Sequence, residues 1–159
     1  HFISKCAWSN DGTKIAITTN NINGYQAKII ILDSNGNELQ TILENKMGAV
    51  GGIDFDVTGN KLLYTHDVSQ NEDWQYRQLD TRIFVYNFNN NTHTDISFIS
   101  LKQIGTVDID PVFSPNSSEI IFTDTSNDFI SQKNIYKIDL NDDDERELIL
   151  SNAEMIDFR

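Results

Sequence analysis

A short pattern recurs three times along this chain and constrains its fold more than any other feature. Each copy begins with an aromatic residue, continues through a polar turn and a charged residue, and ends in an apolar stretch. The copies are Trp8–Ile17, Phe55–Tyr64 and Phe113–Phe122, and their aromatic residues lie 47 and 58 positions apart. A period of this length is typical of repeat architectures, and a repeat of four short strands is typical of a propeller blade.

Strand signals fill each repeat, whereas helical periodicity is nearly absent. The predicted strands are 4–8, 14–19, 28–33 and 38–43 in the first repeat, 51–56, 61–66, 82–87 and 93–98 in the second, and 109–113, 119–124, 134–139 and 146–150 in the third. The predicted fold class is therefore all-β, with consecutive four-stranded antiparallel blades of a β-propeller and about three blades in this chain. The blades are expected at about 3–50, 51–108 and 109–152, and residues 153–159 at the start of a further blade.

The core of such a fold is expected between the blades, because one blade cannot cover both of its own faces. The candidates are the aromatic residues that open the repeats and the residues that end the second strands. They are Trp8, Phe55, Phe113 and Phe158, with Ile17, Tyr64 and Phe122. The single cysteine, Cys6, excludes an internal disulfide and is expected to be a small buried residue.

The charge and the motifs narrow the classes of function. With 24 acidic against 12 basic residues, the net charge of −12 argues against a nucleic-acid partner, because such binding neutralises phosphates with Lys and Arg. No apolar run approaches membrane-spanning length. The sequence contains no nucleotide-binding or hydrolase motif, its histidines lack metal-ligand spacing, and the acidic run Asp142–Glu145 fails the calcium-loop pattern. No catalytic residue, metal or cofactor is therefore predicted.

The repeats resemble a known family. Asp110–Asn116 followed by Glu119–Phe122 resembles the Phe-Ser-Pro-Asp-Gly-x-x-Ile-Ala-Phe signature of TolB-type propeller repeats, and Trp8–Ile17 is similar. Asn134–Asp139 resembles the Ile-Tyr-Val-Met-Asp third strand of that family. The second repeat departs most, since Asp56-Val-Thr replaces Ser-Pro-Asp. The Trp-Asp and Gly-His dipeptides of WD-type repeats are missing. The resemblance to TolB-type repeats covers essentially the whole chain.

This resemblance implies several functions. TolB-like propellers occur in periplasmic and cell-surface interaction proteins of bacteria, as gating domains of prolyl-oligopeptidase-type enzymes, and as catalytic propellers in a few polysaccharide lyases. The leading hypothesis is a non-catalytic segment of a larger bacterial cell-envelope protein, periplasmic or at the cell surface, that binds a protein or peptide. The alternatives are a propeller domain of an enzyme and a purely structural piece. Other blades, from the same or a second chain, are expected as partners. The chain alone is expected either to dimerise into a closed ring or to be poorly soluble.

A binding face is predicted where the longest loops emerge. The loops 67–81 and about 100–110 are expected on the same face, and variable loops on a rigid scaffold tend to carry function. Trp74, Tyr76 and Arg77 are of types enriched at binding hot spots. The alternative is a loop that lies over the surface, with Trp74 packed on its own blade.

Two acidic residues suggest a second candidate site. Asp108 and Asp110 precede a predicted innermost strand and are expected to face the central channel. Carboxylate oxygens there would gather a cation or a basic group of a partner. The alternative is a solvated channel or a turn-capping role for these residues.

Overall fold

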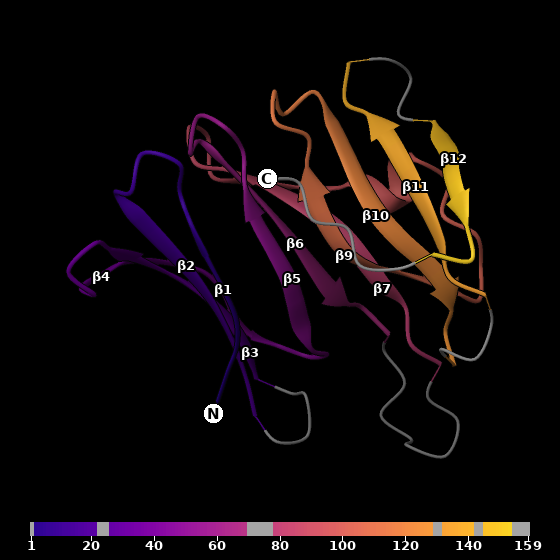
Figure 1. The fold of residues 1–159 in the computed structure, drawn as a ribbon. Coiled ribbons are helices and arrows are strands. Elements are labelled where there is room, and N and C mark those ends of the chain that lie inside the picture. The colour runs from indigo at the N-terminus through magenta and orange to yellow at the C-terminus, as the bar shows by residue number, and fades with distance from the viewer. Residues whose placement is uncertain (1, 22–25, 70–77, 129–131, 142–144, 154–159) are drawn as a thin grey trace.

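Three sheets form the architecture of this chain. The computed structural model describes residues 2–21, 26–69, 78–128, 132–141 and 145–153. Within these residues the strands form three four-stranded antiparallel sheets, each in sequence order, which confirms the predicted propeller blades (Figure 1).

The three blades follow one another along the chain. Blade one contains β1 (Phe2–Trp8), β2 (Lys14–Asn20), β3 (Ala27–Asp33) and β4 (Glu38–Lys46). Blade two contains β5 (Val50–Phe55), β6 (Lys61–Asp67), β7 (Thr81–Asn87) and β8 (Thr92–Asp95). Blade three contains β9 (Thr106–Phe113), β10 (Glu119–Ser126), β11 (Asn134–Asp139) and β12 (Arg146–Ser151). The innermost strands β1, β5 and β9 contact one another in that order, so the blades are arranged side by side around them (Figure 1).

The recurring polar turn joins the first two strands of each blade by the same hydrogen bonds. The residue after the repeat aromatic is Ser9, Asp56 or Ser114, and its amide donates to the carbonyl of the residue five positions later at 2.9–3.1 Å. Its side-chain oxygen accepts the amide of that same later residue at 2.7–3.0 Å. The side chain therefore closes the hairpin, which explains why a short polar residue follows the aromatic in every repeat.

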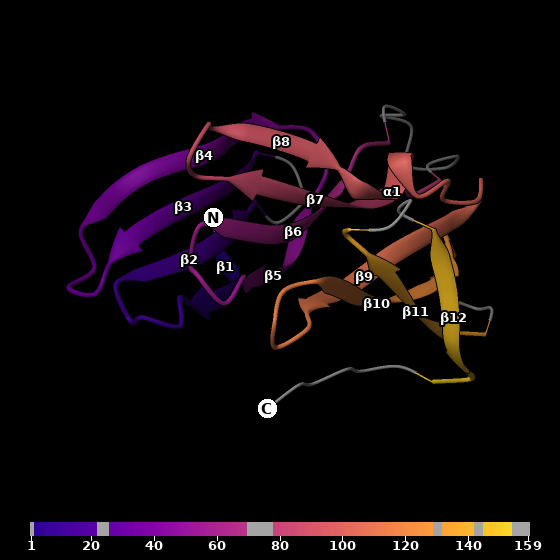
Figure 2. The same cartoon turned by 90° about the horizontal axis from the view of Figure 1, so that it is seen from above.

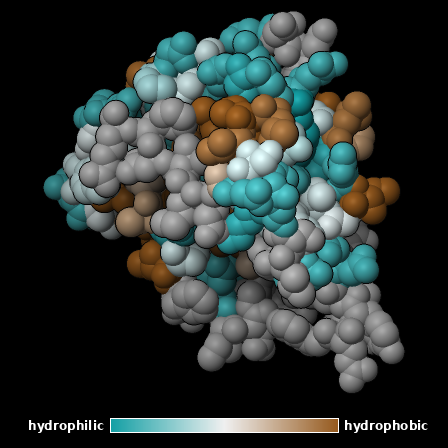
Figure 3. Space-filling model, turned by 45° about the vertical axis from the view of Figure 1, so that its right-hand side comes forward, coloured by the Kyte–Doolittle hydropathy of each residue, from teal (hydrophilic) through white to brown (hydrophobic). Residues whose placement is uncertain are grey.

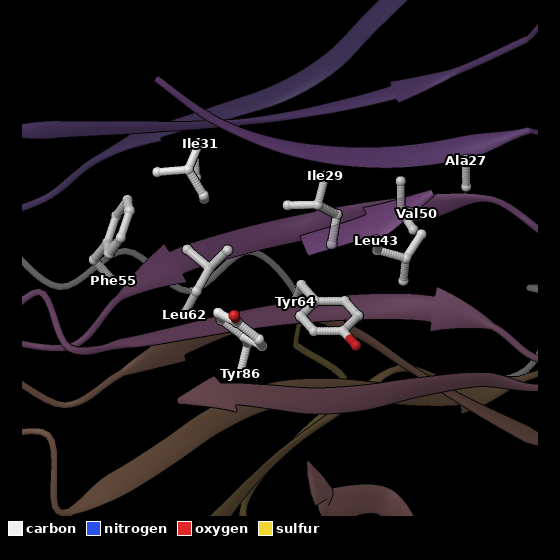
Figure 4. Packing of buried hydrophobic residues seen from close by; sticks show 10 residues of the cluster. Ala27, Ile29, Ile31, Leu43, Val50, Phe55, Leu62, Tyr64 and Tyr86 are labelled. Atoms are coloured by element: carbon white, nitrogen blue, oxygen red, sulfur yellow. The ribbon is translucent and has the colours of Figure 1, made fainter. Parts of the chain in front are cut away.

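The first core lies between blades one and two. Ile29 and Ile31 of β3 face Phe55, Leu62 and Tyr64 of blade two, and all five are buried (Figure 4). Successive strand residues point to opposite faces, so β3 presents alternate aliphatic side chains to its neighbouring blade.

The second core repeats this arrangement between blades two and three. Ile83 and Val85 of β7 pack with Phe113, Ile120 and Phe122 of blade three. The predicted core positions Phe55, Phe113, Tyr64 and Phe122 are thus confirmed as inter-blade residues. Phe158 lies outside the described residues.

The first repeat departs from this expectation. Trp8 is 57% exposed, although Phe55 and Phe113 at the equivalent positions are 6% and 5% exposed. Each of those two aromatics packs against the blade that precedes its own, and no described sheet covers the corresponding face of blade one. For the same reason Ile17 is only half-buried. Cys6 was expected to be buried and is exposed instead.

The outer edge of blade two also differs from the prediction. The strand expected at 93–98 ends at Asp95, and a one-turn helix, α1 (Ile96–Ile99), follows it. The carboxylate of Asp95 accepts the amide of Phe98 at 2.8 Å and so caps the helix. The innermost strand of blade three begins at Thr106 rather than at residue 109.

Candidate functional site on the connection between blades two and three

The two connections between blades differ greatly in length. Residues 47–49 join β4 to β5, whereas residues 96–105 join β8 to β9. The longer connection carries α1 and lies beside β7 and β12 (Figure 2). We call residues 96–105 the platform.

Buried polar side chains hold the platform in place. The hydroxyl of Ser97 accepts the amide of Ile83 at 2.8 Å and donates to the carboxylate of Asp108. Ser97 and Asp108 are both fully buried. The start of the platform is therefore tied to β7 in blade two and to β9 in blade three.

An ion pair extends this anchor to the outermost strand of blade three. The guanidinium of Arg146 donates to both carboxylate oxygens of Asp108, at 2.8 and 2.6 Å. Its Nε donates to the carbonyl and the hydroxyl of Ser100 at 3.0 and 3.1 Å. Its Cζ lies over the Phe122 ring, 5.1 Å from the ring centroid. The bidentate geometry fixes β12, β9 and the platform relative to one another.

Lys102 anchors the end of the platform. Its ammonium donates to the carbonyl of Thr106 at 2.6 Å and pairs with Asp80 at 2.9 Å, and its side chain is nearly buried. Asp80 also accepts from Arg82 at 2.6 Å. Burial would raise the pKa of Asp80, but the hydrogen bonds from Arg82 and Lys102 outweigh it and hold the pKa below its usual value.

Three apolar side chains of the platform point the other way, whereas Ile96 at its start is buried. Phe98 is 69% exposed, Leu101 is 84% exposed, and Ile104 is fully exposed. The usual arrangement is thus inverted, since Ser97, Ser100 and Lys102 are directed inward while large apolar residues stand in water. Such a surface on an anchored loop is typical of a recognition site.

The backbone at Leu101 adds a second unusual feature. Its φ is +55°, in the left-handed region that glycine adopts most easily. Leu101 follows Ser100, the C-cap residue of α1, and glycine is the common choice at that position. A leucine here exposes an apolar side chain at a cost in backbone energy, as often happens at functional sites.

Two hollows lie on either side of Leu101. The first has a volume of about 390 Å³ and is lined by platform residues together with Gln78, Leu79 and Arg82. The second has a volume of about 340 Å³ and lies against Asp124, Tyr136, Glu145 and Arg146. Leu101 and Gln103 border both hollows, so one ligand can cross the platform and enter each of them.

The first hollow brings the two predicted loops together. Gln78–Asp80, at the end of the loop predicted at 67–81, line it beside Ser97, Phe98 and Leu101–Thr106. This agrees with the prediction that the two longest loops emerge on one face. Trp74, Tyr76 and Arg77 lie outside the described residues, and a binding role for them stays a prediction.

The two predicted acidic residues lie inside β9 rather than before it, and they differ in surroundings. Asp108 is buried against Arg146, as described above. Asp110 is exposed with a φ of +49°, at a bulge where it and Pro111 stand opposite the single residue Phe122. Its carboxylate lies 4.0 Å from the ammonium of Lys5 on the innermost strand of blade one. Binding of a cation or a basic group at these aspartates stays a prediction.

The exposed residues of the platform were missed at the sequence level. Residues 93–98 contain apolar side chains, which favoured a strand. Asp95 ahead of Ile96 and Ile99 was the available signal, because a capping residue followed by helical spacing predicts a helix start. No sequence signal shows that Phe98, Leu101 and Ile104 point into water, since such residues are buried in most folds.

The described residues show neither a metal-binding cluster nor a membrane-spanning helix. They contain no group of three or more His, Cys, Asp or Glu side chains placed to hold a metal ion. No helix in the same part of the chain is long and apolar enough to cross a membrane.

The fold defines this chain as part of a β-propeller, and solved structures of other proteins share this fold. No protein-family model matches the sequence, and no curated protein does. Among solved structures, TolB from Acinetobacter baumannii is similar at 21% identity and a TM-score of 0.61, over 89% of this chain and 30% of that one.

Propellers from other settings are equally similar in fold. A chain of the nidogen/laminin complex matches at 16% identity and a TM-score of 0.65, over 94% of this chain and 48% of its own. A prolyl endopeptidase matches at 12% identity and a TM-score of 0.69, over 96% of this chain and 22% of its own. This chain thus spans less than half of each structure, and at these identities the likeness shows the fold alone.

Proposed function

We propose that this chain is a non-catalytic propeller segment that binds a protein or a peptide through the platform, residues 96–105. The observation that carries the proposal is the inversion described above, in which polar side chains are buried as anchors and Phe98, Leu101 and Ile104 are left in water. A rigid platform loses little conformational entropy when it binds, so exposed apolar area on it contributes efficiently to affinity.

The setting of this function follows from the resemblance to TolB-type repeats. In our proposal the segment belongs to a larger bacterial cell-envelope protein, in the periplasm or at the cell surface. Further propeller blades, from the same or a second chain, would cover the open face of blade one at Trp8. The nidogen/laminin neighbour supports protein binding as a use of this fold.

A propeller domain of an enzyme is the rival function, and the prolyl endopeptidase neighbour favours it. In that case the segment would gate or position substrate for a catalytic domain elsewhere, or carry a lyase site itself. Turnover of a peptide or a polysaccharide by this chain alone would support the rival.

Selection from a display library of random twelve-residue peptides tests the proposal. We expect enriched peptides to bind the wild-type chain and to lose most of their affinity for Leu101→Gly and for Phe98→Ser/Ile104→Ser. Glycine is well suited to the left-handed backbone at position 101, so Leu101→Gly should remain folded. Equal binding to all three proteins, or no enrichment at all, would overturn the proposal.

A further inference from the structure

The two hollows beside the platform differ in chemistry. The first is bordered by apolar side chains, among them Leu79, Phe98, Leu101 and Ile104. The second contains the carboxylates of Asp124 and Glu145, the guanidinium of Arg146 and the ring of Tyr136, with Ile99 and Leu101 also in its lining. A ligand that crosses Leu101 therefore meets an apolar surface on one side and an acidic one on the other.

The cations of the first hollow already have partners. Arg82 pairs with Asp80 at 2.6 Å and with Asp95 at 3.1 Å. Lys102 pairs with the same Asp80 and donates to a backbone carbonyl. The charges in this hollow thus compensate one another, and its remaining surface is available for an apolar side chain.

The second hollow has an excess of negative charge. Arg146 is engaged by both oxygens of Asp108, and its nearest nitrogen is 3.8 Å from the carboxylate of Asp124. Burial raises the pKa of Asp124, and the neighbouring carboxylate of Asp108 adds to this, despite a hydrogen bond from Thr106 and the charges of Arg146 and Lys102. Glu145 on the same rim is exposed and adds a further negative charge.

Building on the proposed function, we infer that the partner is a peptide segment that combines an apolar side chain with a nearby lysine or arginine. The apolar side chain occupies the hollow beside Phe98 and Ile104, and the cation enters the hollow of Asp124 and Glu145. Tyr136 offers an aromatic ring to the same cation. The net charge of −12 attracts a basic segment at long range.

Peptide selection on charge variants tests this inference. Twelve-residue peptides are selected on the wild-type chain and on Asp124→Asn/Glu145→Gln, with Glu38→Gln on β4 as a control that removes a carboxylate outside the two hollows. We expect lysine or arginine together with leucine, isoleucine or phenylalanine among wild-type binders. For one synthesised binder, the double variant should weaken binding about tenfold and Glu38→Gln should leave it unchanged.

The outcomes separate this inference from the proposed function. If the binders are apolar, depend on Leu101 and lack basic residues, or if the double variant retains full affinity, the inference is wrong and the proposed function stands. If no binder depends on Leu101, both are wrong. Affinity that falls between 50 and 300 mM NaCl for wild type, with a smaller fall for the double variant, would support the ionic contact.

Discussion

The carboxylate of Asp108 is fully buried and depends on Arg146 for its countercharge. Removing one member of such a pair leaves the other charge buried and uncompensated. We expect Arg146→Ala to lower the free energy of unfolding by about 3 to 5 kcal/mol, measured by urea denaturation. The double variant Arg146→Ala/Asp108→Asn should recover part of this loss.

Lys28→Ala is the control for this prediction, because it removes an exposed ion pair with Glu44 at 2.7 Å. This variant should lower the free energy of unfolding by less than about 1 kcal/mol. Equal losses in Arg146→Ala and Lys28→Ala would contradict the anchoring role of Arg146.

At Leu101 we expect stability and peptide binding to change in different directions. Replacing it by glycine removes the strain of a leucine at a φ of +55° but gives the unfolded chain more freedom. The net expectation is unchanged or higher stability, by up to about 1 kcal/mol, together with weaker peptide binding. Thermal unfolding and a binding isotherm on the same sample measure both. A clear loss of stability would show that Leu101 is kept for packing rather than for recognition.

At the scale of elements, Asp54 joins two innermost strands. Its carboxylate on β5 accepts the amide of Phe113 on β9 at 2.8 Å. Burial raises the pKa of Asp54, although the hydrogen bond from Phe113 acts in the opposite direction. The folded state therefore holds the proton more tightly than the unfolded state does. The contribution of this group to stability is fully present below the unfolded pKa and is lost as pH rises through the folded pKa.

Asp54→Asn tests this linkage, because the amide oxygen still accepts from Phe113 and carries no charge. The variant should gain stability over wild type at pH 7, and the gain should disappear near pH 3, as measured by melting temperatures. Asp54→Ala leaves the amide of Phe113 without its acceptor and should be less stable than Asp54→Asn at both pH values. A difference between wild type and Asp54→Asn that does not vary with pH would contradict this explanation.

The strands were predictable because their causes are local. Gly12 and Gly59 in the hairpin turns have φ values of +69° and +68°, as their sequences suggest. Ser117 holds the corresponding position in the third turn at +57°, and its hydroxyl accepts the amide of Val57 in blade two at 2.7 Å. This contact between blades explains why serine occupies a position at which turn propensity favours glycine.

The candidate site was predictable only in part, because its geometry depends on distant residues. Loop length alone indicated the face on which Gln78–Asp80 and the platform meet. The burial of Asp108 depends on Arg146, which lies 38 positions later in the sequence. The platform was interpreted as strand and loop because its apolar residues suit either, and their exposure is decided by the anchors beneath them.

At the scale of the whole molecule, apolar surface remains at both ends of the array of blades. Trp8 is exposed on blade one, and Leu148, Ile149 and Leu150 of β12 are about half-exposed on blade three. Figure 3 shows separate clusters of hydrophobic side chains on one face of the molecule. Exposed patches of this kind favour association.

We therefore expect the chain alone to self-associate as its concentration rises. Light scattering should give a mass above 18.1 kDa, and Trp8→Ser should shift the equilibrium towards the monomer. Cys6→Ser, a change at an exposed position on the same strand, is the matched control and should have no effect. A wild-type chain that stays monomeric at high concentration would contradict the prediction.

Methyl NMR shows whether a peptide binds at the platform. A peptide selected on the wild-type chain is titrated into protein labelled at Ile, Leu and Val methyl groups. We expect the largest shifts on Ile99, Leu101 and Ile104, with small changes at Ile29 and Ile31 in the core between blades one and two. Shifts concentrated on blade one or on β12, with the platform methyl groups unchanged, would contradict it.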